Sequence, residues 1–182
     1  MRRRTENVYS FTSEINSMGM TPSSTILEFE VISPPPDIVS MLELGAHNTP
    51  IYRFTRIRNV NGQPLILETS FYPTYIYPKL TRELLETHSF YSLLYEEGIV
   101  PYSAVDSYEA VILGRREAEL LGCRPGSCAF SVQRRTRTEA GVVYEFTQSL
   151  IRADRVKLDI YLHKDGVSFT RSVDRQAGTA GK

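Results

Sequence analysis

The chain has 182 residues, the length of about one domain. Lys and Arg total 21 and Asp and Glu total 21, so the zero net charge excludes the whole-surface positive field of a direct binder of DNA or of an anionic membrane. With 41% hydrophobic and 23% charged residues, no apolar run near the ~18 residues of a membrane span and no signal-peptide pattern, we expect a folded cytoplasmic protein.

The first half of the chain predicts three strands and a short helix. In order, the segments are a strand over 25–32, a helix over 38–42 that ends at Gly45, and strands over 51–59 and 64–72. Alternation in the first strand places four side chains on one face, those of Thr25, Leu27, Phe29 and Val31. Three prolines separate this strand from the helix, and Asn61-Gly62 between the last two strands is a strong hairpin signal.

The second half predicts further short elements. They are two short helices within 79–97, a strand over 105–113, a helix over 115–122, and strands over 128–138, 142–152 and 156–163. About six strands joined mostly by tight turns, with three or four short helices, favour an α+β fold, an antiparallel sheet with the helices packed to one side. We expect a linker remnant over 1–8, one domain over 9–163, and a flexible C-terminal tail over 164–182.

Residues that bind metals or carry out catalysis form no recognisable pattern. Cys123 and Cys128 have no second pair, and His47, His88 and His163 are scattered. Phosphate-binding glycine loops and the G-x-S-x-G motif are absent. The sequence therefore predicts no metal, no cofactor and no catalytic residue.

A first candidate site lies in the segment 10–22. Thr12 or Ser13 can cap a helix that ends near Gly19, and Glu14 in the first turn agrees with the helix dipole. The simplest interpretation is a capped helix. The alternative is that its free backbone N–H groups bind an anionic group of a ligand.

Arg56, Arg58 and Glu68 form a second candidate. The two arginines project from one face of a strand, where they could bind a phosphate or carboxylate together, or could simply be solvated. Glu68 lies on the partner strand, and a two-residue Asn61-Gly62 loop would send it to the opposite face. A three-residue loop with Gly62 in a left-handed bulge would bring all three together, and we expect this arrangement.

A third candidate combines Ser89, Tyr91 and Glu145. Ser89 can cap a short helix, which is sufficient to explain it, yet with Tyr91 it also forms an anion-binding set. Glu145 shares a strand face with Thr147 and Ser149. Such a polar stripe is unusual on a central strand unless it faces solvent or a ligand.

Several runs at these same positions, taken in order, resemble the UTRA domain, the effector-binding module of HutC-subfamily GntR bacterial transcription regulators. The runs are SFTSEINSMGMTP, RIR with NGQPLILETSFYP, SFYSLL, and RRTRTEAGVVYE with IRADR. The match covers roughly residues 9–163. It implies a chorismate-lyase-like fold, a homodimer, and a small-molecule pocket that controls a separate winged helix-turn-helix domain. DNA would be a partner only through that N-terminal domain, which is missing from this chain.

The resemblance also implies which residues bind the effector. In members similar to the amino-sugar regulators, the pattern falls on Phe11, Thr12, Ser13, Arg56, Arg58, Glu68, Ser89, Tyr91 and Glu145. By analogy, the arginines with the serine and tyrosine of the 89–91 segment would take a phosphate, and the two glutamates would accept hydrogen bonds from hydroxyl or amide groups.

Three further features follow from the same resemblance. Arg134 matches a family arginine, and the Arg152, Asp154 and Arg155 turn is expected to form a structural ion-pair network. Ile151 stands where the family often has a tyrosine, so an amino-sugar phosphate does not carry over directly. The expected partner is a small anionic effector: a sugar phosphate first, then a phosphonate or an organic acid. The alternative function is an enzyme related to chorismate lyase, because fold alone does not decide between the two.

Overall fold

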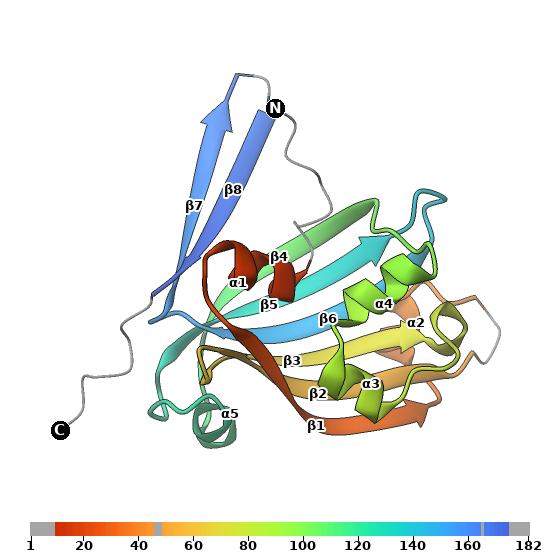
Figure 1. The fold of residues 1–182 in the computed structure, drawn as a ribbon, viewed down its shortest axis with the longest axis horizontal. Helices are drawn as coiled ribbons and strands as arrows, with labels where there is room; N and C mark the ends of the chain where they lie inside the picture. The colour runs from red at the N-terminus through yellow and green to blue at the C-terminus, as the bar shows by residue number, and fades with distance from the viewer. Residues whose placement is uncertain (1–9, 46–48, 165, 175–182) are drawn as a thin grey trace.

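A six-stranded antiparallel sheet forms the centre of the computed structural model, which describes residues 10–45, 49–164 and 166–174 (Figure 1). The strands are β1 Pro22–Ile32, β2 Ile51–Val60, β3 Gln63–Pro73, β4 Ser103–Ile112, β5 Cys128–Arg137 and β6 Val143–Arg152. Their order is β1-β2-β3-β6-β5-β4, so the second half of the chain returns to pair with β3. The expected α+β fold with an antiparallel sheet is confirmed.

Short helices cover both faces of this sheet. The three on the face of Phe54 are α1 Phe11–Ser17, α3 Arg82–Thr87 and α4 Phe90–Glu96, and a 3₁₀ turn, η2 Thr74–Ile76, precedes α3. The other two are α2 Pro36–Met41 and α5 Arg115–Leu120. Ile38 of α2 packs with Ile51 and Phe71, and Ala118 of α5 lies in a cluster with Leu67, all from the opposite face of the sheet. One-sided packing therefore holds for α1, α3 and α4 but is wrong for α2 and α5.

A β-bulge in β1 changes which of its side chains are buried. The register with β2 shifts between Ile26 and Glu28, so Ile26 pairs with Arg56 and Phe29 pairs with Phe54. One extra residue reverses the alternation of side chains. The expectation that Thr25 and Leu27 share a face with Phe29 is therefore wrong, because Ile26 takes that position and is buried.

The β2–β3 hairpin has the two-residue turn that the sequence indicates, followed by an irregularity. Asn61 and Gly62 both have positive φ, as a type I′ turn requires, and Val60 pairs with Gln63. The register then shifts, because Asn59 pairs with Pro64 but Arg58 pairs with Ile66. The extra residue is Leu65, which is buried in the core. The face expected for Arg56, Arg58 and Glu68 is confirmed, but a bulge after a two-residue turn produces it, not a three-residue loop.

The last two strands, β7 Val156–His163 and β8 Gly166–Val173, form a separate antiparallel ribbon that projects from the sheet (Figure 1). Phe169 pairs with Ile160, and Val167 pairs with Leu162. The expected flexible tail over 164–182 is therefore wrong for 166–173, where apolar and polar residues alternate. The expected linker remnant over 1–8 and residues 175–182 of the expected tail lie outside the described residues.

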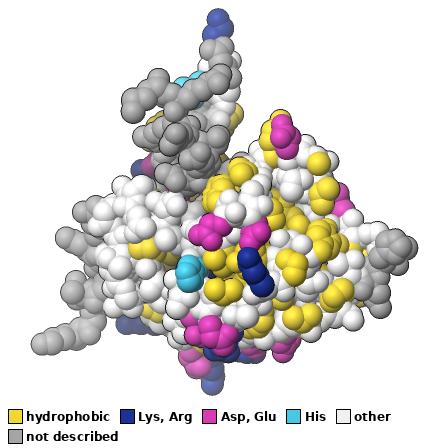
Figure 2. All heavy atoms as spheres, turned by 45° about the vertical axis from the view of Figure 1, so that its right-hand side comes forward, with side chains coloured by type: hydrophobic (Ala, Val, Ile, Leu, Met, Phe, Trp, Pro, Cys, Tyr) yellow, Lys and Arg dark blue, Asp and Glu magenta, His cyan; other side chains and the backbone are white. Residues whose placement is uncertain are grey.

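The surface matches the balanced composition. On the face shown in Figure 2, charged side chains are scattered or gathered in small groups of both signs, without a continuous positive area. None of the helices in the described ranges is long and apolar enough to cross a membrane.

Candidate functional site

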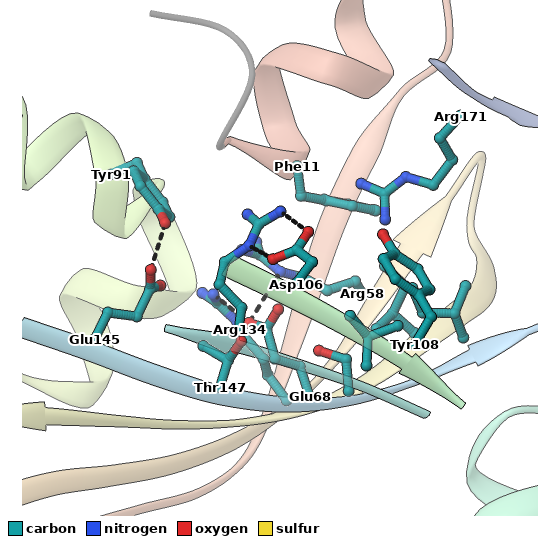
Figure 3. Close-up of a pocket in the computed structure, with 15 residues that line it drawn as sticks. Phe11, Arg58, Glu68, Tyr91, Asp106, Tyr108, Arg134, Glu145, Thr147 and Arg171 are labelled. Atoms are coloured by element: carbon teal, nitrogen blue, oxygen red, sulfur yellow. Dashed lines mark hydrogen bonds and ion pairs between the residues drawn. The ribbon is translucent and has the colours of Figure 1, made fainter. Parts of the chain in front are cut away.

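A small polar cavity lies over the middle of the sheet, on the face that carries α1 and α4 (Figure 3). Its walls come from five strands of the sheet and from α1, α4 and β8. Six of the nine predicted site residues line it: Phe11, Arg56, Arg58, Glu68, Tyr91 and Glu145. Its volume is about 50 Å³. A water needs roughly 10–15 Å³ on this scale, so the cavity as it stands holds a few waters and no metabolite.

Two buried arginines share one carboxylate at the floor of the cavity. Arg56 Nε donates to Glu68 Oε1 at 2.7 Å, and its Nη2 lies 2.5 Å from the same oxygen. Arg58 Nε lies 3.7 Å from that oxygen, too far for a hydrogen bond. Arg58 is otherwise held by Ser24, whose Oγ accepts from Nη1 at 3.0 Å, and by the ring of Phe11, whose centroid lies 5.0 Å from Cζ. The alternative of two solvated arginines is wrong, because both side chains are buried.

Two donors of this pair are unsatisfied. Arg56 Nη1 and Arg58 Nε are buried and have no hydrogen-bond acceptor among the described residues. A buried donor left without an acceptor is costly, and an ionised one more so. The pair also carries one positive charge more than Glu68 neutralises. The unsatisfied donors and the surplus positive charge of this pair suit an anionic acceptor.

The pKa values of this group reflect the same arrangement. Burial raises the pKa of Glu68, but Arg56 and Arg58 outweigh burial and hold it at about 2. Burial and then the positive charge of Arg56 lower the pKa of Arg58 to about 10, although Glu68 acts in the opposite direction. At neutral pH Glu68 and Arg58 are both charged.

Glu145 occupies the other end of the cavity, where three hydroxyl groups of the described residues donate to it. Tyr91 Oη donates to Oε2 at 2.6 Å, and the hydroxyls of Tyr72 and Thr136 donate to the same carboxylate. Burial, followed by the negative charge of Glu145, raises the pKa of both tyrosines well above the ordinary range. The polar stripe of Glu145, Thr147 and Ser149 faces this cavity rather than solvent.

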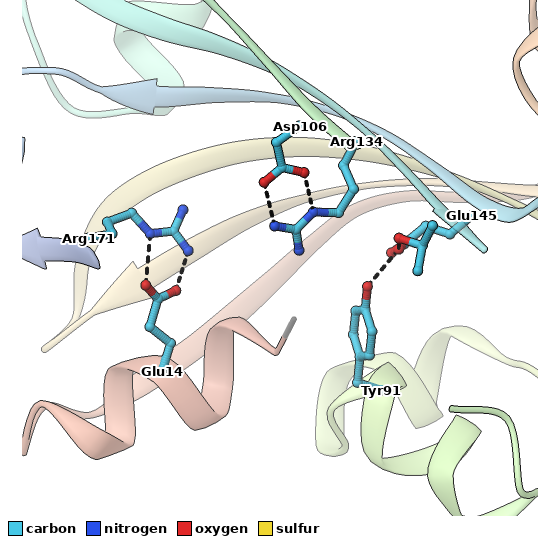
Figure 4. Close-up of polar contacts among 7 residues, drawn as sticks. Glu14, Tyr91, Asp106, Arg134, Glu145 and Arg171 are labelled. Atoms are coloured by element: carbon cyan, nitrogen blue, oxygen red, sulfur yellow. Dashed lines mark hydrogen bonds and ion pairs between the residues drawn. The ribbon is translucent and has the colours of Figure 1, made fainter. Parts of the chain in front are cut away.

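Two ion pairs at the rim were not identified from the sequence. Asp106 accepts from Nε and Nη2 of Arg134 at 2.7 Å each, across the β4–β5 pair, and Arg171 of β8 pairs with Glu14 of α1 (Figure 4). Opposite charges at facing positions of neighbouring strands are a usable signal for Asp106 and Arg134. No sequence signal connects Glu14 with Arg171, because the contact joins the two ends of the domain.

This geometry can be compared with known proteins. The UTRA domain family matches residues 17–157. This chain belongs to that family. It is 29% identical to the HTH-type transcriptional repressor NagR of Bacillus subtilis over 168 residues, which cover 90% of this chain and 67% of NagR. It is 24% identical to the HTH-type transcriptional repressor PhnF of Mycolicibacterium smegmatis over 156 residues, 85% of this chain and 63% of PhnF.

Solved structures agree with the family assignment. The effector domain of PhnF from Mycobacterium smegmatis superposes with a TM-score of 0.71 at 25% identity, covering 80% of this chain and 90% of that one. The ligand-binding domain of a putative GntR-family regulator from Bordetella bronchiseptica gives 0.67 at 25% identity, over 84% and 89%. The UTRA domain described here spans about two thirds of the length of NagR and PhnF.

Two of the three remaining predicted site residues of this UTRA domain lie beside a second cavity, of about 140 Å³. Thr12 and Ser89 line it, and Arg58 lines both cavities. Ser89 occupies the N-cap position of α4 but makes no capping hydrogen bond, so capping does not account for its hydroxyl. Ser13 lines neither cavity.

The cap expected at α1 is also corrected. The N-cap is Ser10, whose Oγ accepts from Ser13 N at 3.4 Å, and not Thr12 or Ser13. The hydroxyl of Thr12 is therefore not used as a cap.

The turn after β6 is structural in this UTRA domain. Arg152 donates to both carboxylate oxygens of Asp154, at 3.0 and 2.6 Å, and to the backbone oxygen of Leu121. Arg155 donates to the backbone oxygen of Pro64. The expected ion pair is confirmed for Arg152 and Asp154. Ile151 lines the cavity and packs in the apolar core, so this wall carries no hydroxyl where the family often has one.

Proposed function

We propose that this UTRA domain is the effector-binding part of a GntR-type transcription regulator and senses a small anionic metabolite. The observation that carries the proposal is the pair of buried donors, Arg56 Nη1 and Arg58 Nε, at the floor of a cavity and without an acceptor. A phosphate, phosphonate or carboxylate would supply that acceptor, and planar guanidinium groups suit all three. A sugar phosphate is the leading candidate, because Glu68 and Glu145 can also accept hydrogen bonds from hydroxyl groups.

The two cavities suggest how such a ligand would lie. Arg58 separates them, so an anion bound to Arg58 can also reach the hydroxyls of Thr12 and Ser89. The rest of the ligand would extend toward Glu145. Neither volume holds a sugar phosphate in the present form, so binding would be accompanied by movement of the wall.

We further propose that the protein works as a homodimer that controls a separate DNA-binding domain, and that NagR-like repression is its mode of action. The ribbon supports the dimer, because one face of it is apolar and uncovered. Ile160 is 68%, Leu162 79%, Val167 69% and Phe169 53% exposed, and pairing in the ribbon places all four on one face. An uncovered apolar face of this kind marks a contact with another protein surface.

Native mass spectrometry and calorimetry test the proposal. Native mass spectrometry of the purified chain would detect a ligand that co-purifies with it. Titration with a panel of sugar phosphates, phosphonates and organic acids should then give a micromolar or tighter complex with at least one anion. Absence of binding across the panel, or turnover of chorismate by the chain, would contradict the proposal and favour the enzyme alternative.

A further inference from the structure

One ion pair joins α1 to the C-terminal ribbon beside the cavity. Arg171 Nε donates to Glu14 Oε1 at 3.1 Å, and Nη2 contacts the other carboxylate oxygen (Figure 4). The two side chains are only 18% and 22% exposed. Arg171 lines the cavity, and so does Phe11 from the same helix as Glu14 (Figure 3). Arg171 lies outside the residues 17–157 that match the family.

The elements that carry this ion pair are the least anchored parts of the cavity wall. Most lining residues belong to β2–β6, where backbone hydrogen bonds run from strand to strand. Tyr91 of α4 is tied to Glu145 by a buried hydrogen bond. In contrast, β8 pairs only with β7, and α1 is a helix of 7 residues that rests on the apolar core through Phe11 and Ile15.

The cavity is so small that its wall must move to admit a ligand, so it matters which wall elements are least anchored. A volume of about 50 Å³ requires the wall to move before anything larger than a few waters enters. Movement of the strands would break backbone hydrogen bonds, whereas separation of α1 from β8 breaks one ion pair and some apolar contacts. Of the described wall, the α1–β8 side is therefore the one that can open at the lowest free-energy cost.

We infer that Arg171 is a positioning residue of the cavity: its ion pair with Glu14 is a latch that holds α1 against the ribbon, and the cavity opens when the pair separates. The inference uses the cavity of the proposed function but does not depend on the identity of the ligand. It assigns to the C-terminal ribbon a role in access to the site.

A thiol placed in the cavity measures this opening without an effector. Cys123→Ala and Cys128→Ser remove the native thiols, and Thr147→Cys places one in the cavity wall at a position that is buried. The rate of modification by the neutral reagent N-ethylmaleimide is followed by mass spectrometry. In this background Arg171→Met and Glu14→Gln should each speed modification about five- to tenfold, the effect of losing a sheltered two-point ion pair. The double variant should be no faster than the faster single variant, and the exchanged pair Glu14→Arg with Arg171→Glu should restore slow modification.

The two single variants separate the latch from simpler explanations. Loss of Arg171 and loss of Glu14 change the local charge in opposite directions, so an effect on thiol ionisation alone would speed one and slow the other. Two controls lie on the opposite face of the sheet: Arg53→Met breaks the Arg53–Glu30 ion pair, and Ile38→Val mildly destabilises the core. Unchanged rates in both latch variants, opposite effects of the two, or equal acceleration by a control would each overturn the inference.

Discussion

At the scale of single residues, Arg58 is unfavourable for the stability of the folded protein, and the proposed ligand binding explains why it is there. Burial lowers its pKa to about 10, which shows that its charged form is disfavoured where it lies. In the part of the chain that the structure describes, its Nε has no hydrogen-bond acceptor. A residue held in this way is easier to explain by a ligand than by stability, because proteins retain destabilising groups mainly at functional sites.

The first prediction concerns this residue. Arg58→Ala should weaken binding of the best anion of the panel by about tenfold to a hundredfold, because each charge-assisted contact contributes roughly 1.5–3 kcal/mol. Arg58→Lys should recover only part of the loss, since an ammonium group cannot make the planar two-point contact. Calorimetry is the measurement, and Arg53→Ala on the opposite face is the matched control. Equal affinity of the wild type and Arg58→Ala would remove the anion site as described.

The second prediction concerns Glu68 and acid. Its pKa is 4.5 in a model peptide and about 2 in the folded protein, so folding favours the charged form. The resulting stability is present above pH 4.5 and is lost as the pH falls through about 2, with a total of roughly 3 kcal/mol. Urea unfolding at several pH values between 6 and ~2 measures it.

Substitution tests the source of that acid dependence. Glu68→Gln should lower the free energy of unfolding at neutral pH, because Arg56 and Arg58 lose their shared carboxylate. It should also reduce the further loss of stability as the pH falls from 4.5 to about 2, which is called the acid limb below. Glu30→Gln, at an exposed ion pair, should retain the wild-type acid limb. An unchanged limb in Glu68→Gln would show that other carboxylates cause it.

At the scale of elements, the β2–β3 hairpin determines the site. Its turn alone would place Glu68 on the face opposite Arg56, and the extra residue Leu65 restores the shared face. The turn and the bulge together therefore set the register that brings Arg56 and Glu68 into one cavity.

The third prediction concerns this turn. Gly62 has φ of +76°, and nothing lies within 4 Å of the position of an added Cβ, so the cost of Gly62→Ala comes from the backbone alone. It should destabilise the domain by about 1 kcal/mol. Gly45→Ala is the matched control, because that position is equally open but has no positive φ, and it should be neutral or slightly stabilising. Urea midpoints compare the two, and equal midpoints would contradict the assigned turn.

At the scale of the whole molecule, the β7–β8 ribbon has an apolar face that the single chain covers only at its inner end. Its inner end packs in the core through Val156 and Val173, and Arg171 on the same face reaches the cavity. Its outer end presents only exposed apolar side chains on that face. A second copy that covers the outer end would fix the ribbon, and with it Arg171.

The fourth prediction concerns assembly. The wild-type chain should sediment as a dimer at tens of micromolar, where a complex of about −6 to −7 kcal/mol is populated. Phe169→Asp should shift it to monomer, because a charge on the apolar face is desolvated in the interface. Ser172→Asp is the control, since its side chain lies on the other face of the ribbon, where it pairs with Lys157. A monomeric wild type, or equal effects of the two substitutions, would contradict an interface on this face.

The sequence by itself determined most of the secondary structure of this protein, with β8 as the main exception, because periodicity and turn residues are local signals. Alternation over 51–59 and 64–72, with Asn61-Gly62 between them, predicted a hairpin that is present. The resemblance to the UTRA domain named nine site residues, of which six line one cavity and two others line its neighbour. These parts of the prediction required only the order of residues along the chain.

Only the tertiary structure decided what those residues do together. The bulges near Leu27 and at Leu65 each reverse the facing of a strand, and no local pattern marks them. The placement of α2 and α5 on the opposite face depends on which apolar surface remains uncovered after the sheet forms. The Glu14–Arg171 contact joins residues 157 positions apart, and such a contact exists only once the intervening sheet has brought its two ends together.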